Sequence, residues 1–190
     1  MTLLLAACLA TPASQAAKVV LAGGCFWCME ADFEKLTGVS EAISGFTGGS
    51  HPDPTYNGAH TGHYEAVEIQ YDPDIIDYRG ILDHFWVNHD PFDDQGQFCD
   101  KGHSYLAAIF VADDEQRRIA EQTRQDVVEM VPDKTVVTPI LDLGTFYPIK
   151  GEESYHQDYY KKSSLRYKYY RFACGRDRRL SEIWGDKAKP

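Results

Sequence analysis

The order of apolar and polar residues divides the chain into short segments separated by Gly, Pro and Asp. Four segments are predicted as strands from their alternating or continuous apolar residues, at residues 18–22, 39–46, 65–71 and 105–112. Two segments repeat apolar residues at helical spacing and are predicted as helices, at residues 25–36 and 78–88. In chain order these elements run strand, helix, strand, strand, helix, strand. This order is typical of a split βαβ (ferredoxin-like) two-layer α/β sandwich, and we expect an α+β fold of that kind.

Beyond these six elements the pattern predicts C-terminal additions. Asp113 is expected to cap a long polar helix that ends near Met130. We expect a strand at residues 134–141 and a short helix at residues 152–162, whereas residues 163–190 show no clean period. The chain contains no internal repeat and no linker, so at 190 residues it is long enough for one domain, which we place at residues 18–190.

The first residues differ in character from the rest. An apolar run from Leu3 to Ala10 precedes a small-residue cleavage site at Ser14 to Ala16, so we expect residues 1–17 to be an export leader. The protein would then be periplasmic, or lipid-anchored through Cys8, because the Leu-Ala-Ala-Cys sequence that ends there matches a lipoprotein cleavage box. No Lys or Arg precedes Leu3, which would fit a misplaced or truncated start; the alternative to a leader is a frayed tail on a cytoplasmic protein.

Composition excludes several classes of function. The formal net charge of −10 argues against a nucleic-acid binder, although the tail interleaves basic and aromatic residues. No apolar run approaches the roughly 20 residues that span a bilayer, so we expect no transmembrane segment. The histidines show no tight metal-ligand spacing, and we expect no metal.

The cysteines are too few for a disulfide scaffold and indicate chemistry instead. Cys25 follows the predicted first strand and a double glycine, and it begins the first helix. Unpaired N–H groups and the helix dipole at that position favour a thiolate, and the glycines Gly23 and Gly24 would let a substrate approach the backbone. Cys28, three residues on, would lie on the same helical face and within reach of a disulfide with Cys25.

Three simpler interpretations of the two cysteines remain open. They could form half of a zinc site, but the chain has no second CxxC and no close Cys–His pair. They could be a structural disulfide or two packed thiols. They could also be a thioredoxin-type redox pair, although Trp usually precedes the first cysteine of such pairs and Trp27 lies between these two.

Glu65 supplies a second chemical signal. In its predicted strand it shares a face with Val67, Ile69 and Tyr71, which we expect to be the core face. Burial there would raise the pKa of the carboxyl, which could then hold a proton near neutral pH and act as a general acid. The alternative is a glutamate at a strand end that reaches solvent. A thiolate beside an acid predicts thiol redox chemistry without naming the substrate.

Four segments, GGCFWCMEADFEKLTGV, GFTGG, PTYNGAHTGHYEAVEIQYDP and YHQDYY, together resemble the A-type peptide-methionine sulfoxide reductases. The resemblance runs from about residue 19 to residue 184. It implies a fold built around a split βαβ core. It also implies reduction of the S-epimer of methionine sulfoxide, free or in proteins, through a cysteine sulfenic acid and an intramolecular disulfide, which repairs oxidative damage. We expect a monomer without bound cofactor, oxidised proteins or peptides as partners, and an external dithiol such as thioredoxin as reductant.

The resemblance assigns roles to individual residues. It implies that Cys25 is the nucleophile and Glu65 the acid that protonates the sulfoxide oxygen. The implied substrate-binding residues are Phe26 and Trp27 at the S-methyl group, Tyr56 and Tyr105 at the oxygen, and Asp100 and Tyr159 along the pocket.

The resolving thiol stays open between two cysteines. Cys28 is near in sequence, whereas Cys174 resembles the family's mobile C-terminal resolving cysteines, and Arg171 and Arg176 are expected to favour its thiolate. We prefer a relay from Cys25 to Cys28 to Cys174.

The chain departs from the family pattern at two positions. Cys99 beside Asp100 is expected to be an inert, semi-buried thiol, and Leu106 replaces an Arg that commonly follows the tyrosine. The other classes considered are a thioredoxin-like protein disulfide oxidoreductase and a non-enzymatic metal or interaction domain.

Overall fold

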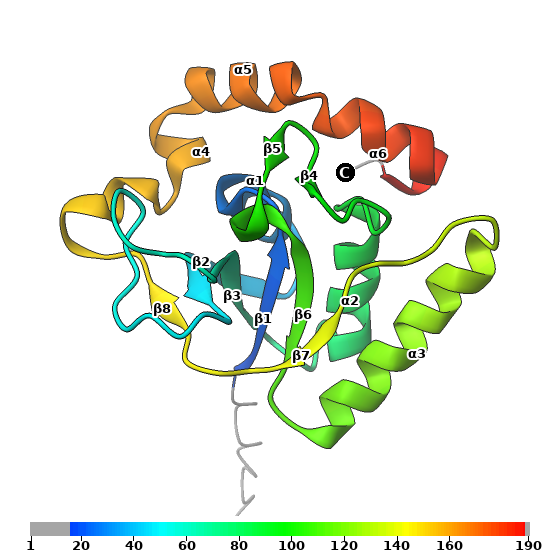
Figure 1. Ribbon diagram of the computed structural model, residues 1–190. Helices are drawn as coiled ribbons and strands as arrows, with labels where there is room; N and C mark the ends of the chain where they lie inside the picture. Colours follow the sequence, from blue (N-terminus) through cyan, green and yellow to red (C-terminus); the bar gives the residue numbers. More distant parts are fainter. Residues whose placement is uncertain (1–15, 189–190) are drawn as a thin grey trace, which may run out of the picture.

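The computed structural model describes residues 16–188, so the leader expected at residues 1–17, with Cys8, lies almost entirely outside the described residues (Figure 1). The strands are β1 Ala17–Gly23, β2 Val39–Thr47, β3 Tyr64–Tyr71, β4 Gly96–Gln97, β5 Asp100–Lys101, β6 Ala107–Val111, β7 Ile140–Asp142 and β8 Tyr147–Pro148. The α-helices are α1 Phe26–Phe33, α2 Tyr78–Val87, α3 Asp114–Met130, α4 Tyr159–Lys162, α5 Ser164–Cys174 and α6 Arg176–Trp184. Short 3₁₀ helices are η1 His103–Tyr105, η2 Gly151–His156 and η3 Gly185–Ala188.

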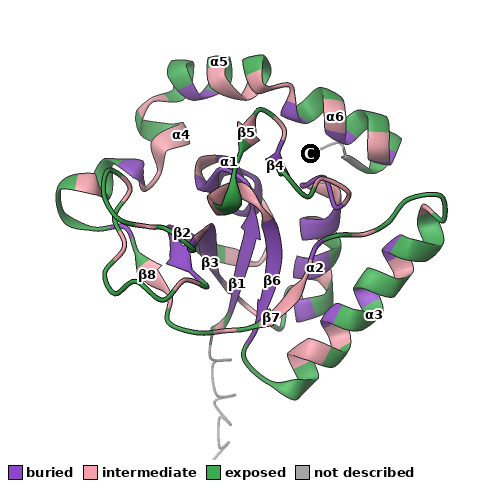
Figure 2. Ribbon diagram, in the orientation of Figure 1, coloured by how far each residue is buried: buried purple, intermediate pink, exposed green. Residues whose placement is uncertain are grey.

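A six-stranded sheet forms the centre of this mixed α/β fold. Its strand order is β7-β6-β1-β3-β2-β8, and β4 and β5 form a separate two-stranded sheet. Neighbouring strands of the large sheet are antiparallel, except for β6 and β7, which are parallel. The central strands β1, β3 and β6 are buried nearly throughout (Figure 2), as expected for strands covered on both faces.

The two faces of the sheet are covered differently. Helices α1, α2 and α3 pack on one face, where Leu21, Val67 and Ile109 join the main hydrophobic core. On the other face, alternate residues of the same strands, such as Val20 and Phe110, are covered by the chain that follows β7. The helices therefore lie on one side, and a single extended segment closes the other.

The C-terminal helices lie across the end of the sheet at which β1 passes into α1 (Figure 1). Tyr167 of α5 packs against Cys28 and Ala31 of α1, and Arg176 of α6 donates to the carbonyl of Gly23 at the end of β1. No helix in residues 16–188 has the length and apolar character needed to cross a membrane.

The first six predicted elements are found within a few residues of their expected bounds, and α3 follows its predicted cap Asp113 and ends at Met130, but the strand expected at 134–141 and the helix expected at 152–162 are found only in part. Only Ile140 and Leu141 of the strand expected at 134–141 pair in the sheet, because the preceding chain follows another course, with Val137 N–H bonded to Pro91 O at 2.8 Å. The helix expected at 152–162 is interrupted at Asp158, whose φ of 53° is left-handed. The tail without a clean period forms α5 and α6.

Candidate active site

The turn between β1 and α1 places Cys25 at the N-cap of the helix. Gly24 has a φ of +86°, which favours glycine. A Cβ on Gly24 would also lie 2.5 Å from Cβ of Gln97, and one on Gly23 would lie 2.4 Å from Sδ of Met29. The two glycines therefore make room for the protein's own side chains, which corrects the expectation that they admit a substrate to the backbone.

Glu65 meets the start of α1 from the neighbouring strand β3. The side chain is 3% exposed, and its Oε2 accepts a hydrogen bond from Phe26 N–H at 3.1 Å. Burial raises the pKa of this carboxyl to about 8, against the opposing effect of the Phe26 hydrogen bond. Glu65 is thus predominantly protonated at neutral pH and lies beside Cys25, as its position on the core face of the strand predicted.

Cys25 and Cys28 are free thiols, 6% and 2% exposed, and they hydrogen-bond to each other. Burial, reinforced by the neighbouring Cys28 and Glu65, raises the pKa of Cys25 well above its ordinary value. The hydrogen bond from Cys25, helped by the charges of Arg176 and Arg171, lowers the pKa of Cys28 despite its burial. The thiolate expected at Cys25 is therefore corrected: Cys28 is the more acidic thiol of the resting pair.

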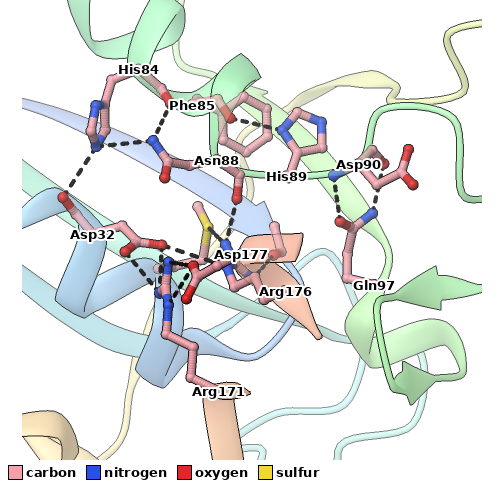
Figure 3. Close-up of polar contacts among 12 residues, drawn as sticks. Asp32, His84, Phe85, Asn88, His89, Asp90, Gln97, Arg171, Arg176 and Asp177 are labelled. Atoms are coloured by element: carbon pink, nitrogen blue, oxygen red, sulfur yellow. Dashed lines mark hydrogen bonds and ion pairs between the residues drawn. The ribbon is translucent and has the colours of Figure 1, made fainter. Parts of the chain in front are cut away.

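Arg171 of α5 and Arg176 of α6 extend to Asp32, near the C-terminal end of α1 (Figure 3). Arg171 Nη1 lies 2.8 Å from Asp32 Oδ1, and Arg176 Nε lies 3.5 Å from Asp32 Oδ2. Arg176 is 1% exposed, and it donates to Gly23 O at 3.3 Å. A buried guanidinium needs such partners to compensate its lost hydration, and its charge stabilises an anion at the nearby Cys28.

Aromatic rings enclose the same helix start. Trp27 stacks on Tyr159 with ring centroids 3.9 Å apart, and its Nε1 donates to Nδ1 of His156 at 3.0 Å. The rings of Phe26 and Tyr56 lie 5.6 Å and 4.0 Å from that of His156. These side chains form a continuous apolar wall next to the two thiols.

Hydroxyl and carboxyl groups complete the site. Burial and then Glu65 raise the pKa of Tyr56 to about 12, and the same two causes raise the pKa of Tyr105, so both phenols keep their protons. Tyr170 of α5 donates its hydroxyl proton to Asp100, and the same hydroxyl lies in hydrogen-bond contact with Cys25. The predicted residues Cys25, Cys28, Phe26, Trp27, Glu65, Tyr56, Asp100, Tyr105 and Tyr159 are therefore brought together at one site.

Cys174 is placed differently from expectation. It forms a disulfide with Cys99, 75 positions away. The prediction of an inert, semi-buried thiol at Cys99 is wrong, because this residue is exposed between β4 and β5 and its sulfur is bonded. The expected effect of Arg171 and Arg176 on Cys174 is also not found, since both guanidinium groups pair with the buried Asp32 instead.

Two groups of potential metal ligands occur among residues 16–188, and neither contains Cys25 or Cys28. One is Glu30, Glu34 and Asp158. Here Lys161 already forms ion pairs with Glu34 and Asp158. The other is Cys99, Asp100 and Cys174, whose two sulfurs are bonded to each other. Neither arrangement supports the zinc interpretation of the CxxC.

Two residues of the site were not selected from the sequence, Tyr170 and His156, and Arg176 was selected only for an effect on Cys174. His156 lies in the YHQDYY segment, so that motif pointed to it. Because its Nδ1 accepts from Trp27, the proton sits on Nε2, which is buried and has no partner in the described part of the chain. Tyr170 lies one helical turn before Cys174, but the sequence did not predict a helix there.

A family model described as "Peptide methionine sulfoxide reductase" matches residues 17–188. The chain is 47% identical over 180 residues to "Peptide methionine sulfoxide reductase MsrA 2" of Caulobacter vibrioides, covering 93% of this chain and 89% of that protein. It is 44% identical over 172 residues to "Peptide methionine sulfoxide reductase MsrA/MsrB" of Vibrio cholerae, covering 88% of this chain and 45% of that protein. The chain thus spans less than half of the Vibrio cholerae relative.

Solved structures share the fold. Methionine sulfoxide reductase A of Corynebacterium diphtheriae superposes with a TM-score of 0.68 at 29% identity, covering 82% of this chain and 77% of that one. Mxr1 from Saccharomyces cerevisiae in complex with Trx2 superposes with a TM-score of 0.55 at 21% identity, covering 78% of this chain and 87% of that one. Both likenesses extend over most of the described residues.

Proposed function

Because the chain belongs to the peptide methionine sulfoxide reductase family, we propose that it reduces the S-epimer of methionine sulfoxide, free or in proteins, to methionine. The observation that carries this proposal is the start of α1, where the Cys25 thiol and the protonated Glu65 carboxyl lie beside an aromatic wall. A sulfoxide oxygen leaves sulfur only when it is protonated, so this chemistry needs a nucleophile and an acid side by side.

The pair of thiols generates the nucleophile. Cys25 hydrogen-bonds to Cys28 and lies at the N-cap of α1, where unpaired N–H groups and the helix dipole stabilise the thiolate that forms when Cys25 gives up its proton. Cys25 then attacks the sulfoxide sulfur while Glu65 gives its proton to the oxygen. Methionine departs, and the oxygen remains on Cys25 as a sulfenic acid.

The walls of the site bind the substrate. Phe26 and Trp27 supply the apolar contact for the S-methyl group, with Tyr159 stacked behind Trp27. Tyr56 and Tyr105 keep their protons because their pKa values are raised, so each can donate a hydrogen bond to the sulfoxide oxygen. These donors stabilise the charge that develops on oxygen before Glu65 protonates it.

The sulfenic acid is resolved inside the chain. Cys28 attacks the sulfur of Cys25, which forms a Cys25–Cys28 disulfide and releases water. No cofactor is needed for these steps, and an external dithiol must return the electrons. We infer a thioredoxin-like reductant, in keeping with the yeast fold relative, whose structure contains Trx2.

An assay that separates the two sulfoxide epimers tests the proposed function. The substrates are the S- and R-forms of a methionine sulfoxide peptide, with thioredoxin as reductant. We expect turnover of the S-form alone. Turnover of an insulin-type protein disulfide with neither sulfoxide reduced would instead establish the disulfide oxidoreductase, which the burial of Cys25 and Cys28 disfavours.

We further propose that the six-element core is a ferredoxin-like split βαβ unit. The sheet order β6-β1-β3-β2, with all neighbours antiparallel and α1 and α2 on one face, supports it. We also propose that the enzyme is a monomer. Sedimentation of the purified protein tests the monomer.

Export of the protein is also a proposal. The apolar run at Leu3 to Ala10 and the small residues before Ala17 support a leader. Cleavage after Ala16 would leave β1 complete, whereas cleavage before Cys8 would leave a lipidated N-terminus. The N-terminal sequence and mass of the protein from its native cell distinguish these forms, and an intact Met1 on cytoplasmic protein would refute export.

A further inference from the structure

We propose that Cys99 and Cys174 form a second redox-active pair. Through this pair an external dithiol reduces the disulfide of the buried Cys25 and Cys28 back to two thiols. This inference rests on the proposed function, because the sulfoxide must first oxidise the buried pair. Its new component is Cys99, which the exposed turn between β4 and β5 holds against the end of α5. We call Cys25 and Cys28 the inner pair, and Cys99 and Cys174 the outer pair.

Helix α5 connects the two pairs. Tyr167 packs against Cys28 in one buried cluster, and Tyr170 packs against the edge of the same cluster. Cys174 follows Tyr170 by four residues and Tyr167 by seven, so the three side chains share one face of the helix. The face that covers Cys28 therefore leads to the outer pair over about 10 Å of helix.

The end of α5 is built so that Cys174 can cross this distance. Cys174 is the last residue of α5, and a glycine in the left-handed conformation follows it. Arg171, one turn earlier, is held by its ion pair with Asp32, which itself lies one turn beyond Cys28 on α1. The three residues after Arg171 span about 10 Å when extended. Unwinding the last turn thus brings Cys174 to Cys28 while the ion pair holds the rest of α5.

The electrons pass by two thiol–disulfide exchanges. The Cys174 thiolate attacks the Cys28 sulfur of the oxidised inner pair, which forms a Cys28–Cys174 bond and releases Cys25. The Cys99 thiolate then attacks the Cys174 sulfur, which forms the outer disulfide and releases Cys28. One disulfide becomes two thiols and two thiols become one disulfide, so two electrons move from the outer to the inner pair. An external dithiol reduces the outer disulfide in the same way and leaves as its own disulfide.

The charges around Cys28 favour the second exchange. A thiol of low pKa is the better leaving group, and the hydrogen bond from Cys25 and the charges of Arg176 and Arg171 lower the pKa of Cys28. The Cα atoms of Cys99 and Cys174 lie 4.9 Å apart, within the range of a disulfide, so the second exchange can end in this bond with the backbone as it stands.

Exposure separates the tasks of the two pairs. The inner thiols are 6% and 2% exposed, so a folded protein reductant cannot bring its own sulfur into line with them. Cys99 is exposed, and Cys174 is partly exposed beside the strongly exposed Phe172. A protein dithiol can reach the outer pair without any opening of the substrate site.

Counting methionine formed without a reductant tests the transfer. The full chain, carrying Cys8→Ser in every arm, is reduced with a small dithiol, freed of it, and given excess S-sulfoxide peptide. We expect about two methionines per chain from the otherwise unchanged protein, and about one from Cys174→Ser, since only the inner pair then supplies electrons. Ala173→Ser, an exposed neighbour, serves as the matched control and should also give about two.

Peptide mapping of Cys99→Ser tests the new residue itself. Without Cys99 the second exchange cannot occur, so we expect the Cys28–Cys174 disulfide to accumulate, with Cys25 carrying a sulfenic acid that a dimedone probe labels. One methionine per chain from the unchanged protein, or two from Cys174→Ser, would overturn the outer pair as a carrier. No methionine from Cys174→Ser would also overturn it. No methionine from any form would instead reject the proposed function, so the two failures are distinguishable.

Discussion

Cys25 and Cys28 lie one helical turn apart and are almost completely buried, whereas Cys99 and Cys174 are joined across 75 positions at the surface. The protonation of the inner pair is influenced by the hydrogen bond between its two thiols, by the protonated carboxyl of Glu65, and by the charges of the buried Arg176 and the partly buried Arg171. The outer pair lies at the end of α5 and in the turn between β4 and β5. Burial suits chemistry that must exclude water, and exposure suits exchange with a partner, so one chain keeps the two tasks in separate places.

Cys25→Ser is expected to have the largest effect on methionine formation and to distinguish the inner pair from the outer pair. A serine hydroxyl is not ionised near neutral pH, so we expect methionine formation to be lost even in a single turnover. Cys99→Ser, the matched change in the outer pair, should still form methionine in a single turnover and lose steady-state activity with thioredoxin. Rapid-quench measurement of methionine checks both variants. Single-turnover activity in Cys25→Ser would remove Cys25 as the nucleophile.

Glu65→Gln tests the acid of the inner site. The amide is nearly isosteric and can still accept from Phe26 N–H, so we expect the fold to persist while sulfenic acid formation slows by about 10²-fold or more. In the unchanged protein the rate should fall as the pH rises above about 8, where Glu65 loses its proton. That decline should be absent in Glu65→Gln. An unaltered rate in the variant would require another acid.

Tyr170→Phe tests the contact by which α5 reaches the inner site. The variant loses the hydrogen bonds to Asp100 and Cys25 and keeps the ring. A net loss of about 1–1.5 kcal/mol corresponds to roughly tenfold in the rate of the first step. Tyr169→Phe is the matched control, because this neighbouring tyrosine is 75% exposed. Equal rates in both variants would show that α5 does not act on the chemistry.

Stability against pH tests the raised pKa of Glu65 without any measurement of activity. The pKa of Glu65 is raised to about 8 from an unfolded value near 4.3, so the unfolded state releases this proton at lower pH than the folded state does. The carboxyl therefore destabilises the fold increasingly as the pH rises from about 4 to about 8. We therefore expect the free energy of unfolding of the unchanged protein to fall relative to that of Glu65→Gln as the pH rises across this range. Urea denaturation of both proteins measures this difference. A pH-independent difference would contradict the raised pKa.

The inner site could be predicted because its signals are local. A strand, two glycines and a helix start place Cys25, and alternation along β3 turns Glu65 to the core. The protonation of the pair could not be predicted this way, since it depends on Arg171 and Arg176, which arrive from the far end of the chain. Only the folded contact shows which thiol the arginines favour.

The outer pair and the helices α5 and α6 could not be predicted from the sequence for a related reason. Helix α5 buries only Tyr167, and α6 begins at the buried but charged Arg176, so apolar spacing does not mark the start of either helix. Because α5 was not predicted, Cys174 could not be placed next to a partner, and Cys99 was predicted to be inert. The strand expected at 134–141 failed because β-branched residues favour a strand only where a neighbour is present to pair with them.

The most direct test of two pairs in series is the disulfide map after one equivalent of substrate. The fully reduced chain with Cys8→Ser receives one equivalent of S-sulfoxide peptide, is quenched by alkylation in acid, and is mapped by mass spectrometry. The account predicts a Cys99–Cys174 disulfide with Cys25 and Cys28 alkylated. A persistent Cys25–Cys28 disulfide with Cys99 and Cys174 alkylated would contradict it.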